Sequence, residues 1–382
     1  RLGVVAPVLE TRETSMAFVA LANFSRIPSP ELLQALFTRV GELLPLLQPQ
    51  QVANILWSLA NLGISPPAPV MRALEDRAAA TMHDFLPQNV MNTLWAIAVL
   101  AEDPATPWNN LLLKELAERT RTTMSVRLLS QKRAKPAPLD VMNYTQLHQF
   151  FLSLSLDRAP DARLPHEMVA LRQTLGLACR DAFASISSAP SRLQEDVADT
   201  LRAMGLAVRE EARDPLSGYS IDILLPAPAP EALGDTDRPS APGVAIEVDG
   251  PVHFLSDSRA LKGRTLIKRR HLLALGYSLV AVPYWEWSEA RNKRDRQAYL
   301  TEKLRTALPP RIPAWLLLPP GAHQKIPERS GIAHRPASGT SGAEAAAEAV
   351  QDVEVEHVEV REEAMHAAAV GGEGGGKAAI AA

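Results

Sequence analysis

The sequence contains almost no cysteine, no long hydrophobic run and little net charge. A single cysteine, Cys179, in 382 residues excludes an internal disulfide framework and indicates a reducing compartment. No stretch of about 18 uninterrupted apolar residues occurs, so neither a membrane span nor a membrane partner is expected. Apolar residues nevertheless make up 46% of the chain, enough for a sizeable core. These features exclude small disulfide-stapled proteins and helical membrane proteins.

The formal net charge of −3 conceals a segregation of charge along the chain. Residues 341–382 carry nine acidic and two basic side chains, whereas residues 251–306 carry twelve Lys/Arg and five Asp/Glu. A local basic surface favours a polyanionic partner, although a solvated helix face would have the same composition. Residues 319–382 are rich in Pro, Gly, Ala and Glu and lack aromatic residues, which predicts a disordered tail able to compete for the basic face.

A repeat of 38 residues occupies the first third of the chain. The segment "PQQVANILWSLANLGISPP" begins at Pro49 and "PQNVMNTLWAIAVLAEDP" begins at Pro87, and their alignment pairs Trp57 with Trp95. An earlier copy includes "MAFVALANFSRIPSPELLQAL", and a degenerate fourth copy, "NYTQLHQFFLSLSL", places Phe151 in the tryptophan position. We interpret these tryptophans as core residues. A fixed period of this length is the signature of stacked repeat units.

Each copy is predicted to form two helices. In the second copy, apolar side chains recur at helical spacing, and Gly63 ends the first helix. One helical pair cannot bury its own apolar face, so neighbouring pairs must stack, which predicts an α-solenoid over residues 1–157. Connecting helices are expected over residues 158–190. The basic, proline-containing segment from Arg127 to Asp140 is predicted to be an exposed loop that interrupts the period.

Polar amides recur near the start of the predicted first helices. They are Gln50, Gln51, Asn54, Gln88, Asn89 and Asn92. Helical arrays can read one RNA base per repeat through side chains in such positions. Amides near a helix start can equally act as helix caps. Both interpretations stay open, and Gln50, Asn54, Gln88 and Asn92 are the candidate RNA contacts.

The region after the repeats has the pattern of a small α/β domain over residues 191–306. Capping-box spacing in "SRLQ" opens a helix that Gly205 ends. Strands are predicted at 206–212, 219–226, 244–250 and 277–287, the last running into an aromatic turn, with helices at 258–275 and 292–306. This order predicts a sheet covered by helices. Trp285 and Trp287 either stack on bases or cap the sheet.

Three acidic residues interrupt the apolar strands of this region. Glu247 and Asp249 lie two residues apart, so they share one face of a strand, and Asp222 interrupts the preceding strand. Three neighbouring carboxylates are costly unless a cation or basic groups offset them, and oxygen ligands of this kind suit Mg²⁺. Asp222, Glu247 and Asp249 are therefore candidate metal ligands.

Basic residues of the following helix offer the alternative to a metal. Arg264, Lys268 and His271 lie at i, i+4 and i+7, hence on one face, and Arg269 adjoins them. These residues either neutralise the acids or face a phosphodiester backbone. His253, after the Gly-Pro turn, is a proton carrier or a hydrogen-bond partner at the strand end. All five are candidate RNA contacts.

The segments "SIDILLP", "VAIEVDGPVHF" and "TLIKRRHLLALGYSLVAVPYWEW" together resemble the RAP domain, named for RNA-binding proteins abundant in apicomplexans. The resemblance covers about Leu206 to Leu304. The 38-residue units, over residues 16–155, resemble the octotricopeptide repeats of green-algal organellar proteins. The FAST-kinase-domain proteins of mitochondria are similar in carrying helical repeats and a terminal RAP domain. The resemblance implies binding of single-stranded organellar RNA and control of mRNA or rRNA processing, stability or translation.

The RAP domain in turn resembles the PD-(D/E)xK nuclease fold. By position, Asp222 and Glu247 match the two metal-binding acids, but Asp249 stands where that pattern has a lysine. Lys268 or His253 is a candidate replacement. An active nuclease would thus use Asp222, Glu247, Asp249 and Lys268 with Mg²⁺. RNA binding without cleavage needs no cofactor, and this is the behaviour we expect.

The resemblance also implies an organellar location, in the chloroplast stroma or the mitochondrial matrix. The sequence begins at Arg1 rather than Met, so we expect a fragment or processed product in which a targeting segment is not visible. Other RNA-processing proteins or nucleases are expected partners. A helical scaffold that binds only proteins is the remaining alternative.

Overall fold

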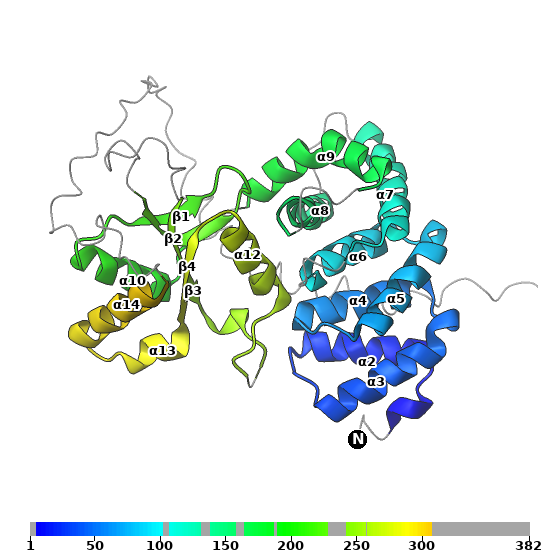
Figure 1. The fold of residues 1–382 in the computed structure, drawn as a ribbon, viewed down its shortest axis with the longest axis horizontal. Coiled ribbons are helices and arrows are strands. Elements are labelled where there is room, and N and C mark those ends of the chain that lie inside the picture. The colour runs from blue at the N-terminus through cyan, green and yellow to red at the C-terminus, as the bar shows by residue number, and fades with distance from the viewer. Residues whose placement is uncertain are drawn as a thin grey trace, which may run out of the picture. The chain divides into compact units, whose positions relative to one another are not determined.

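The computed structural model describes residues 5–101, 107–130, 138–157, 164–186, 189–227, 242–256 and 258–307, with the side chains of 124–130 and 138–140 excepted (Figure 1). All of these residues belong to one compact unit, Arg1–Lys325. The predicted acidic tail, residues 319–382, lies outside the described residues. The predicted domain boundaries stay predictions.

Eight helices form four consecutive hairpins in the first half of the described chain (Figure 1). One row consists of α2, α4, α6 and α8, each in contact with the next, and the other row consists of α3, α5, α7 and α9. The hairpins are α2 (Thr11–Asn23) with α3 (Pro30–Leu43), α4 (Pro49–Leu62) with α5 (Ala68–Ala80), α6 (Pro87–Leu100) with α7 (Asn110–Ser130), and α8 (Pro138–Leu156) with α9 (His166–Ala184). The predicted apolar stripe of α4 is fully buried in this arrangement.

The 38-residue period is visible in the backbone as well as in the sequence. Short 3₁₀ turns precede three of the first helices: η1 (Ala6–Val8), η2 (Leu44–Leu46) and η3 (Met82–Asp84). The first helix of the second hairpin ends, as predicted, at Gly63, whose φ of 62° is left-handed. Position 3 of α2, α4 and α6 supplies a cap, since Glu13, Gln51 and Asn89 accept a hydrogen bond from the backbone N–H three residues earlier.

An arginine in the second helix of each of the first three hairpins reinforces the same period. Arg77 donates to the carbonyl oxygen of Leu47 at 3.0 and 2.8 Å, and Arg119 donates to that of Phe85 at 2.9 and 2.7 Å. Arg39 makes the corresponding bond to Leu9 at 2.7 Å. These carbonyls precede the helices, and a buried carbonyl without a partner is costly. The arginine therefore ties the two helices of one hairpin together, a feature that the sequence analysis did not find.

The rest of the described chain folds around a four-stranded mixed sheet. The strands lie in the order β1 (Arg209–Arg213), β2 (Ser220–Pro226), β3 (Gly243–Asp249) and β4 (Ser278–Pro283). The pairs β1–β2 and β2–β3 are antiparallel and β3–β4 is parallel. The crossover between β3 and β4 contains η4 (Pro251–His253) and α12 (Gly263–Ala274).

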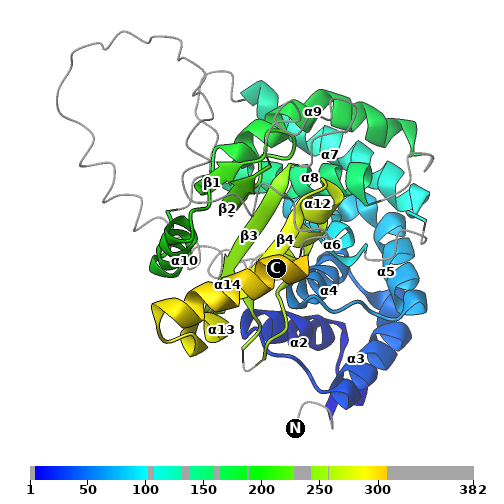
Figure 2. The same cartoon turned by 60° about the vertical axis from the view of Figure 1, so that its left-hand side comes forward.

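Helices cover both faces of this sheet (Figures 1 and 2). On one face α10 (Arg192–Ala203) and α14 (Lys293–Ala307) pack on the alternate residues Val244, Ile246 and Val248. On the other face α12 packs against Ala245 through Leu272. The alternation of inward-facing residues along β3 follows from the pleat, so Glu247 and Asp249 face α12.

The helix α12 lies between the sheet and the hairpins, in contact with α4, α6 and α8 (Figures 1 and 2). Its first residue, Gly263, approaches the backbone of α4 so closely that a Cβ there would lie 1.8 Å from the Ala60 carbonyl oxygen. Only glycine permits this approach without a shift of backbone.

Three predicted elements differ in extent from those observed. The helix expected from residue 258 begins at Gly263, because Phe254 and Leu261 first form an antiparallel bridge. The last strand ends at Pro283 and not at 287, and the following aromatic residues form the short helix α13 (Tyr284–Glu289). Both ends of the predicted 127–140 loop are helical, and its residues 131–137 lie outside the described residues.

The structure is thus mostly helical with a small mixed sheet in its C-terminal half, as the mixed fold class predicts. Classification as an α-solenoid and as a nuclease-like fold stays a prediction. Among the helices that the structure describes, none combines the length and the apolar composition needed to cross a bilayer.

Candidate nucleic-acid interface

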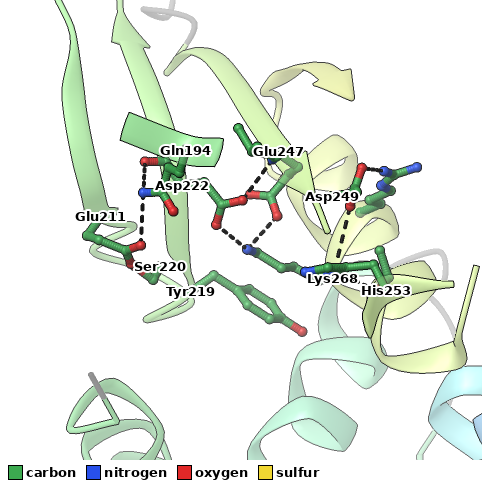
Figure 3. Close-up of polar contacts among 12 residues, drawn as sticks. Gln194, Glu211, Tyr219, Ser220, Asp222, Glu247, Asp249, His253 and Lys268 are labelled. Carbon is green, nitrogen blue, oxygen red and sulfur yellow. Dashed lines mark hydrogen bonds and ion pairs between the residues drawn. The ribbon is translucent and has the colours of Figure 1, made fainter. Parts of the chain in front are cut away.

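The three predicted acids project from the sheet toward α12 (Figure 3). Ile223 pairs with Ile246 in the antiparallel register, which places Asp222 beside Glu247. Asp249 lies two residues further along β3, next to Pro283 of β4. The structure therefore gathers these carboxylates at the end of the sheet where β3 finishes.

Lys268 of α12 reaches across two of these acids (Figure 3). Its Nζ lies 2.5 Å from Glu247 Oε2 and 3.6 Å from Asp222 Oδ1. Burial disfavours the charged ammonium, but the attraction of Glu247 and Asp222 outweighs this cost and raises the pKa of Lys268. Lys268 therefore keeps its charge and offsets that of Asp222 and of the ionised form of Glu247.

Glu247 is the more deeply buried partner, with 2% of its side chain exposed. Burial raises the pKa of its carboxyl to about 8, although Lys268 opposes this shift. Its Oε1 has no hydrogen-bond partner among the described residues. Asp222, by contrast, accepts a hydrogen bond from the backbone N–H of Val248 at 2.8 Å. Glu247 consequently holds a proton at higher pH than an ordinary glutamate.

Asp249 is held by different basic groups. Arg269 donates to its Oδ2, and His253 Nδ1 lies 3.6 Å from its Oδ1. Burial raises the pKa of Asp249 to about 6, against the attraction of Arg269. Burial also lowers the pKa of His253, whose Nδ1 lies 3.2 Å from the Thr265 hydroxyl.

The three acids as placed do not form the metal site expected from the sequence. Within the described ranges, no group of three or more His, Cys, Asp or Glu side chains is close enough to hold a metal ion. The Lys268 ammonium contacts both Asp222 and Glu247, and Arg269 pairs with Asp249. A cation at this position would therefore have to displace the basic groups that already pair with these carboxylates.

The basic candidates on α12 differ in their accessibility. Arg264 is exposed and has no ion-pair or hydrogen-bond partner in the part of the chain that the structure describes. The side chains of Lys268 and Arg269 are 21% and 18% exposed, and both are bound to acids of the sheet. Lys262, directly before α12, is half-buried. Arg264 is thus the candidate best placed to meet a phosphate.

The prediction of His271 as an RNA contact is wrong. Its side chain is fully buried, and its two ring nitrogens are hydrogen-bonded to Ser153 of α8 at 2.8 Å and to the Tyr219 hydroxyl at 3.0 Å. Burial lowers the pKa of His271, although Asp157, 3.6 Å away, opposes the shift. The residue joins α12 to the last hairpin because this side of the helix faces α8 and not solvent.

The four candidate amides of the hairpins also differ in burial and in hydrogen bonding. Asn92 is buried and accepts hydrogen bonds from Gln88 at 2.9 Å and from Gln146 at 3.3 Å, so it is not available to a base. Gln88 is exposed but donates to Asn92, whereas Gln50 and Asn54 are half-buried. The capping alternative is confirmed for the neighbouring Gln51 and Asn89, as described above. The prediction of Asn92 as a base-reading residue is therefore wrong.

The sequence analysis missed the role of Arg270. This side chain binds Asp157 at 3.0 and 2.9 Å and donates to the carbonyl oxygens of Val99, at 3.0 Å, and Ala98 at the end of α6. It thereby satisfies carbonyls that a helix end leaves without partners. The sequence signal for this role was the position of Arg270 on the helix. Six residues separate it from Arg264, which places it about 120° around the axis from Arg264, on another side of the helix.

The comparison with protein families supports the resemblance noted in the sequence. Residues 246–303 match the family model of the RAP domain. This segment is a RAP domain. It contains most of β3, all of α12 and β4, and most of α14. Glu247, Asp249 and Lys268 lie within the RAP domain, whereas Asp222 precedes the matched residues.

Three curated relatives show the same limited match. The chain is 43% identical to human "FAST kinase domain-containing protein 3, mitochondrial" over 61 residues, which are 16% of this chain and 9% of the relative. It is 43% identical to mouse "FAST kinase domain-containing protein 4" over 56 residues, 15% of this chain and 9% of the relative. It is 43% identical to mouse "FAST kinase domain-containing protein 1, mitochondrial" over 68 residues, which are 17% of this chain and 8% of the relative. The matches thus span less than a tenth of each relative.

Proposed function

We propose that this protein binds single-stranded organellar RNA and acts in the processing, maturation or stability of mRNA or rRNA. The RAP domain grips the RNA backbone, and the helical hairpins, as octotricopeptide-type repeats, supply sequence preference. The match to the RAP family and the likeness to FAST kinase domain-containing proteins, two of them named as mitochondrial, support an RNA-associated role in an organelle.

One structural observation carries this proposal. The acids beside α12 are already paired with Lys268 and Arg269, so Arg264, an exposed residue, is not needed for internal neutralisation. Partial burial of its guanidinium lowers the pKa of Arg264, and no acid among the described residues opposes this shift. A charged side chain that the fold does not use, next to half-buried Lys262, suits a phosphate of an RNA backbone. Such binding requires no metal, because lysine and arginine supply the positive charge.

The proposal is tested by measuring RNA affinity at several salt concentrations. The full chain should bind single-stranded organellar RNA with an affinity that falls steeply as salt is added, because each phosphate contact releases counterions. Arg264→Ala should weaken binding to all sequences alike and reduce the slope of log K against log salt by about 0.7, the value for one contact with a single strand.

The matched control is Arg305→Ala, which removes a surface arginine of α14 on the other face of the sheet. Its affinity and salt slope should equal those of the wild type. Binding that does not change with salt, or equal effects of the two variants, would contradict the proposal. Failure to bind any organellar RNA would instead favour a protein-binding scaffold.

A Mg²⁺-dependent endoribonuclease is the second candidate, favoured by the contact of Lys268 with both Asp222 and Glu247. In the resembling nuclease pattern a lysine stands beside two acids, and here the lysine would come from α12 in place of the β3 position held by Asp249. Purified protein should then cleave RNA when Mg²⁺ is added, and Asp222→Asn and Glu247→Gln should each abolish cleavage. RNA that stays intact with Mg²⁺ and Mn²⁺ would remove this candidate.

A further inference from the structure

Beside the cationic end of α12 lies a cluster that we call the aromatic edge. It consists of the aromatic side chains of Phe254, Tyr284 and Trp285 with the adjoining Val252 and Arg259. The Trp285 ring lies 4.4 Å from that of Phe254 and 5.2 Å from that of Tyr284, centroid to centroid. The guanidinium of Arg259 stands 5.2 Å from the Trp285 ring centroid, in a cation–π contact. The cluster forms where β4 ends and α13 begins, next to the end of β3.

The aromatic edge is only partly exposed, since Phe254 is buried and Trp285 is half-buried. Tyr284 is 37% exposed and Val252 is 72% exposed, and the Tyr284 hydroxyl has no hydrogen-bond partner among the described residues. Trp287, one helical turn further on, is 2% exposed, and its indole N–H donates to Asp196 at 3.0 Å. Trp287 is thus a structural residue that caps the sheet. Tyr284 instead presents apolar surface to solvent, which is costly unless something covers it.

Positive side chains lie directly beside this surface. The backbone N–H of Lys262 donates to the His253 carbonyl at 2.9 Å, and Leu261 bridges to Phe254, so the start of α12 is joined to the aromatic edge. Burial lowers the pKa of His253, and the positive charges of Lys268 and Arg264 add to this shift. Phosphate-binding side chains and exposed rings therefore occupy neighbouring positions.

The first hairpin continues the same surface. The backbone N–H of Ser256 donates to the Ser25 carbonyl at 2.7 Å, and the Ser256 hydroxyl donates to the Phe24 carbonyl at 3.2 Å. Phe24 itself is 71% exposed. A second accessible aromatic side chain, contributed by the hairpins, is thus brought next to the loop of the RAP domain.

We propose that the aromatic edge binds an unpaired nucleobase, stacked on the Tyr284 ring, while Arg264 and Lys262 hold the adjoining phosphates. This inference rests on the proposed RNA binding and adds the part of the RNA that this surface recognises, an unpaired base. Exposed rings interleaved with arginine and lysine are complementary to the two chemistries of a single strand, a π-face and a phosphate. A paired base inside a duplex could not reach the ring, so the site selects single-stranded RNA over double-stranded RNA.

The test compares two RNAs on the full chain. The first is a single-stranded oligouridylate, and the second is the same oligonucleotide with abasic ribose at its central positions. The wild type should bind the base-bearing RNA about tenfold more tightly, since stacking of one base is worth roughly this factor. Tyr284→Ala should remove the difference by weakening only the base-bearing complex, and Tyr284→Phe, which keeps the ring, should restore it.

Two further variants separate the possible outcomes. Arg264→Ala should weaken both complexes equally, and Leu177→Ala, at an exposed leucine of α9, should change neither. Equal affinity of the wild type for the two RNAs overturns the stacking proposal without reference to any variant. If Tyr284→Ala leaves both RNA affinities unchanged but no longer binds a protein that the wild type binds, the stacking proposal is overturned and the aromatic edge is assigned to a protein partner. Absence of binding to either RNA removes the proposed function as well.

Discussion

Glu247 and Lys268 show how a buried acid and a basic side chain share one site. The carboxyl has 2% of its surface exposed, so its ionised form is disfavoured even with an ammonium 2.5 Å away. Its pKa rises from 4.5 to about 8. Below pH 4.5 the carboxyl is protonated in both folded and unfolded chains, whereas between pH 4.5 and 8 only the unfolded chain releases the proton. Glu247 therefore contributes stability at low pH that is lost as pH rises through this window.

We expect Glu247→Gln to remove this pH dependence. The difference between the unfolding midpoints, variant minus wild type, should increase as the pH rises from 4.5 to about 8. The wild type loses stability over this window, whereas the neutral amide of the variant has no proton to lose. The control is Glu302→Gln, at an exposed glutamate whose pKa is lowered by Arg305, so its effect should be constant over the same window. A difference curve for Glu247→Gln that is flat from pH 5 to 8 would contradict the raised pKa.

At the scale of elements, α12 distributes a run of basic residues among different partners. Lys268 and Arg269 bind acids of the sheet, whereas Arg270 and His271 bind α6 and α8. Arg264, one turn earlier, is left for solvent. The sheet covers one side of α12 and the hairpins cover the other. Each basic residue on a covered side has a partner, because an unpaired buried charge is costly.

Arg270→Ala is expected to destabilise the protein strongly. It would leave Asp157, whose side chain is 2% exposed, as a buried charge without its partner, and such losses cost about 3–5 kcal/mol. Urea unfolding measures the effect as a lower midpoint with an unchanged slope. Arg305→Ala, which breaks an exposed ion pair of α14, should leave the midpoint almost unchanged. Similar shifts in the two variants would show that the Arg270 contacts do not stabilise the fold.

At the scale of the whole molecule, the hairpins and the sheet share an extensive interface within one unit. The loop before α12 contacts the end of α2 through Ser256, and α12 itself contacts α4, α6 and α8. Every first helix of the four hairpins thus meets the α/β part. This interface holds the hairpins and the RAP domain together, which suits the proposed recognition of one continuous RNA strand.

We expect Gly263→Ala to loosen both sides of this interface together. The added Cβ would lie 1.8 Å from the Ala60 carbonyl, so backbone must move, and amide hydrogen exchange should quicken at the end of α4 and in α12 alike. Gly41→Ala is the matched control, since Gly41 is exposed in the last turn of α3 with nothing within 4 Å of its Cβ, and it should not destabilise the protein. Faster exchange confined to α12 would contradict a shared interface.

The sequence by itself determined what depends on local pattern. The 38-residue register, the apolar stripe of α4, its glycine stop and the strands around Asp222 and Glu247 follow from periodicity and turn residues, whereas the RAP segment follows from resemblance to a family. Helix and strand periods are set by neighbouring residues along the chain, so they are visible without a fold.

Only the tertiary structure decided which polar groups are free. His271 and Asn92 look like surface residues in the sequence but are buried, and Arg270 looks like its neighbours but binds the ends of two helices. Charges separated by more than a hundred residues, such as Arg270 and Asp157, meet only when α12 is enclosed between sheet and hairpins. Burial makes an unpaired charge costly, so long-range packing, and not local sequence, assigns each basic side chain to the fold or to solvent.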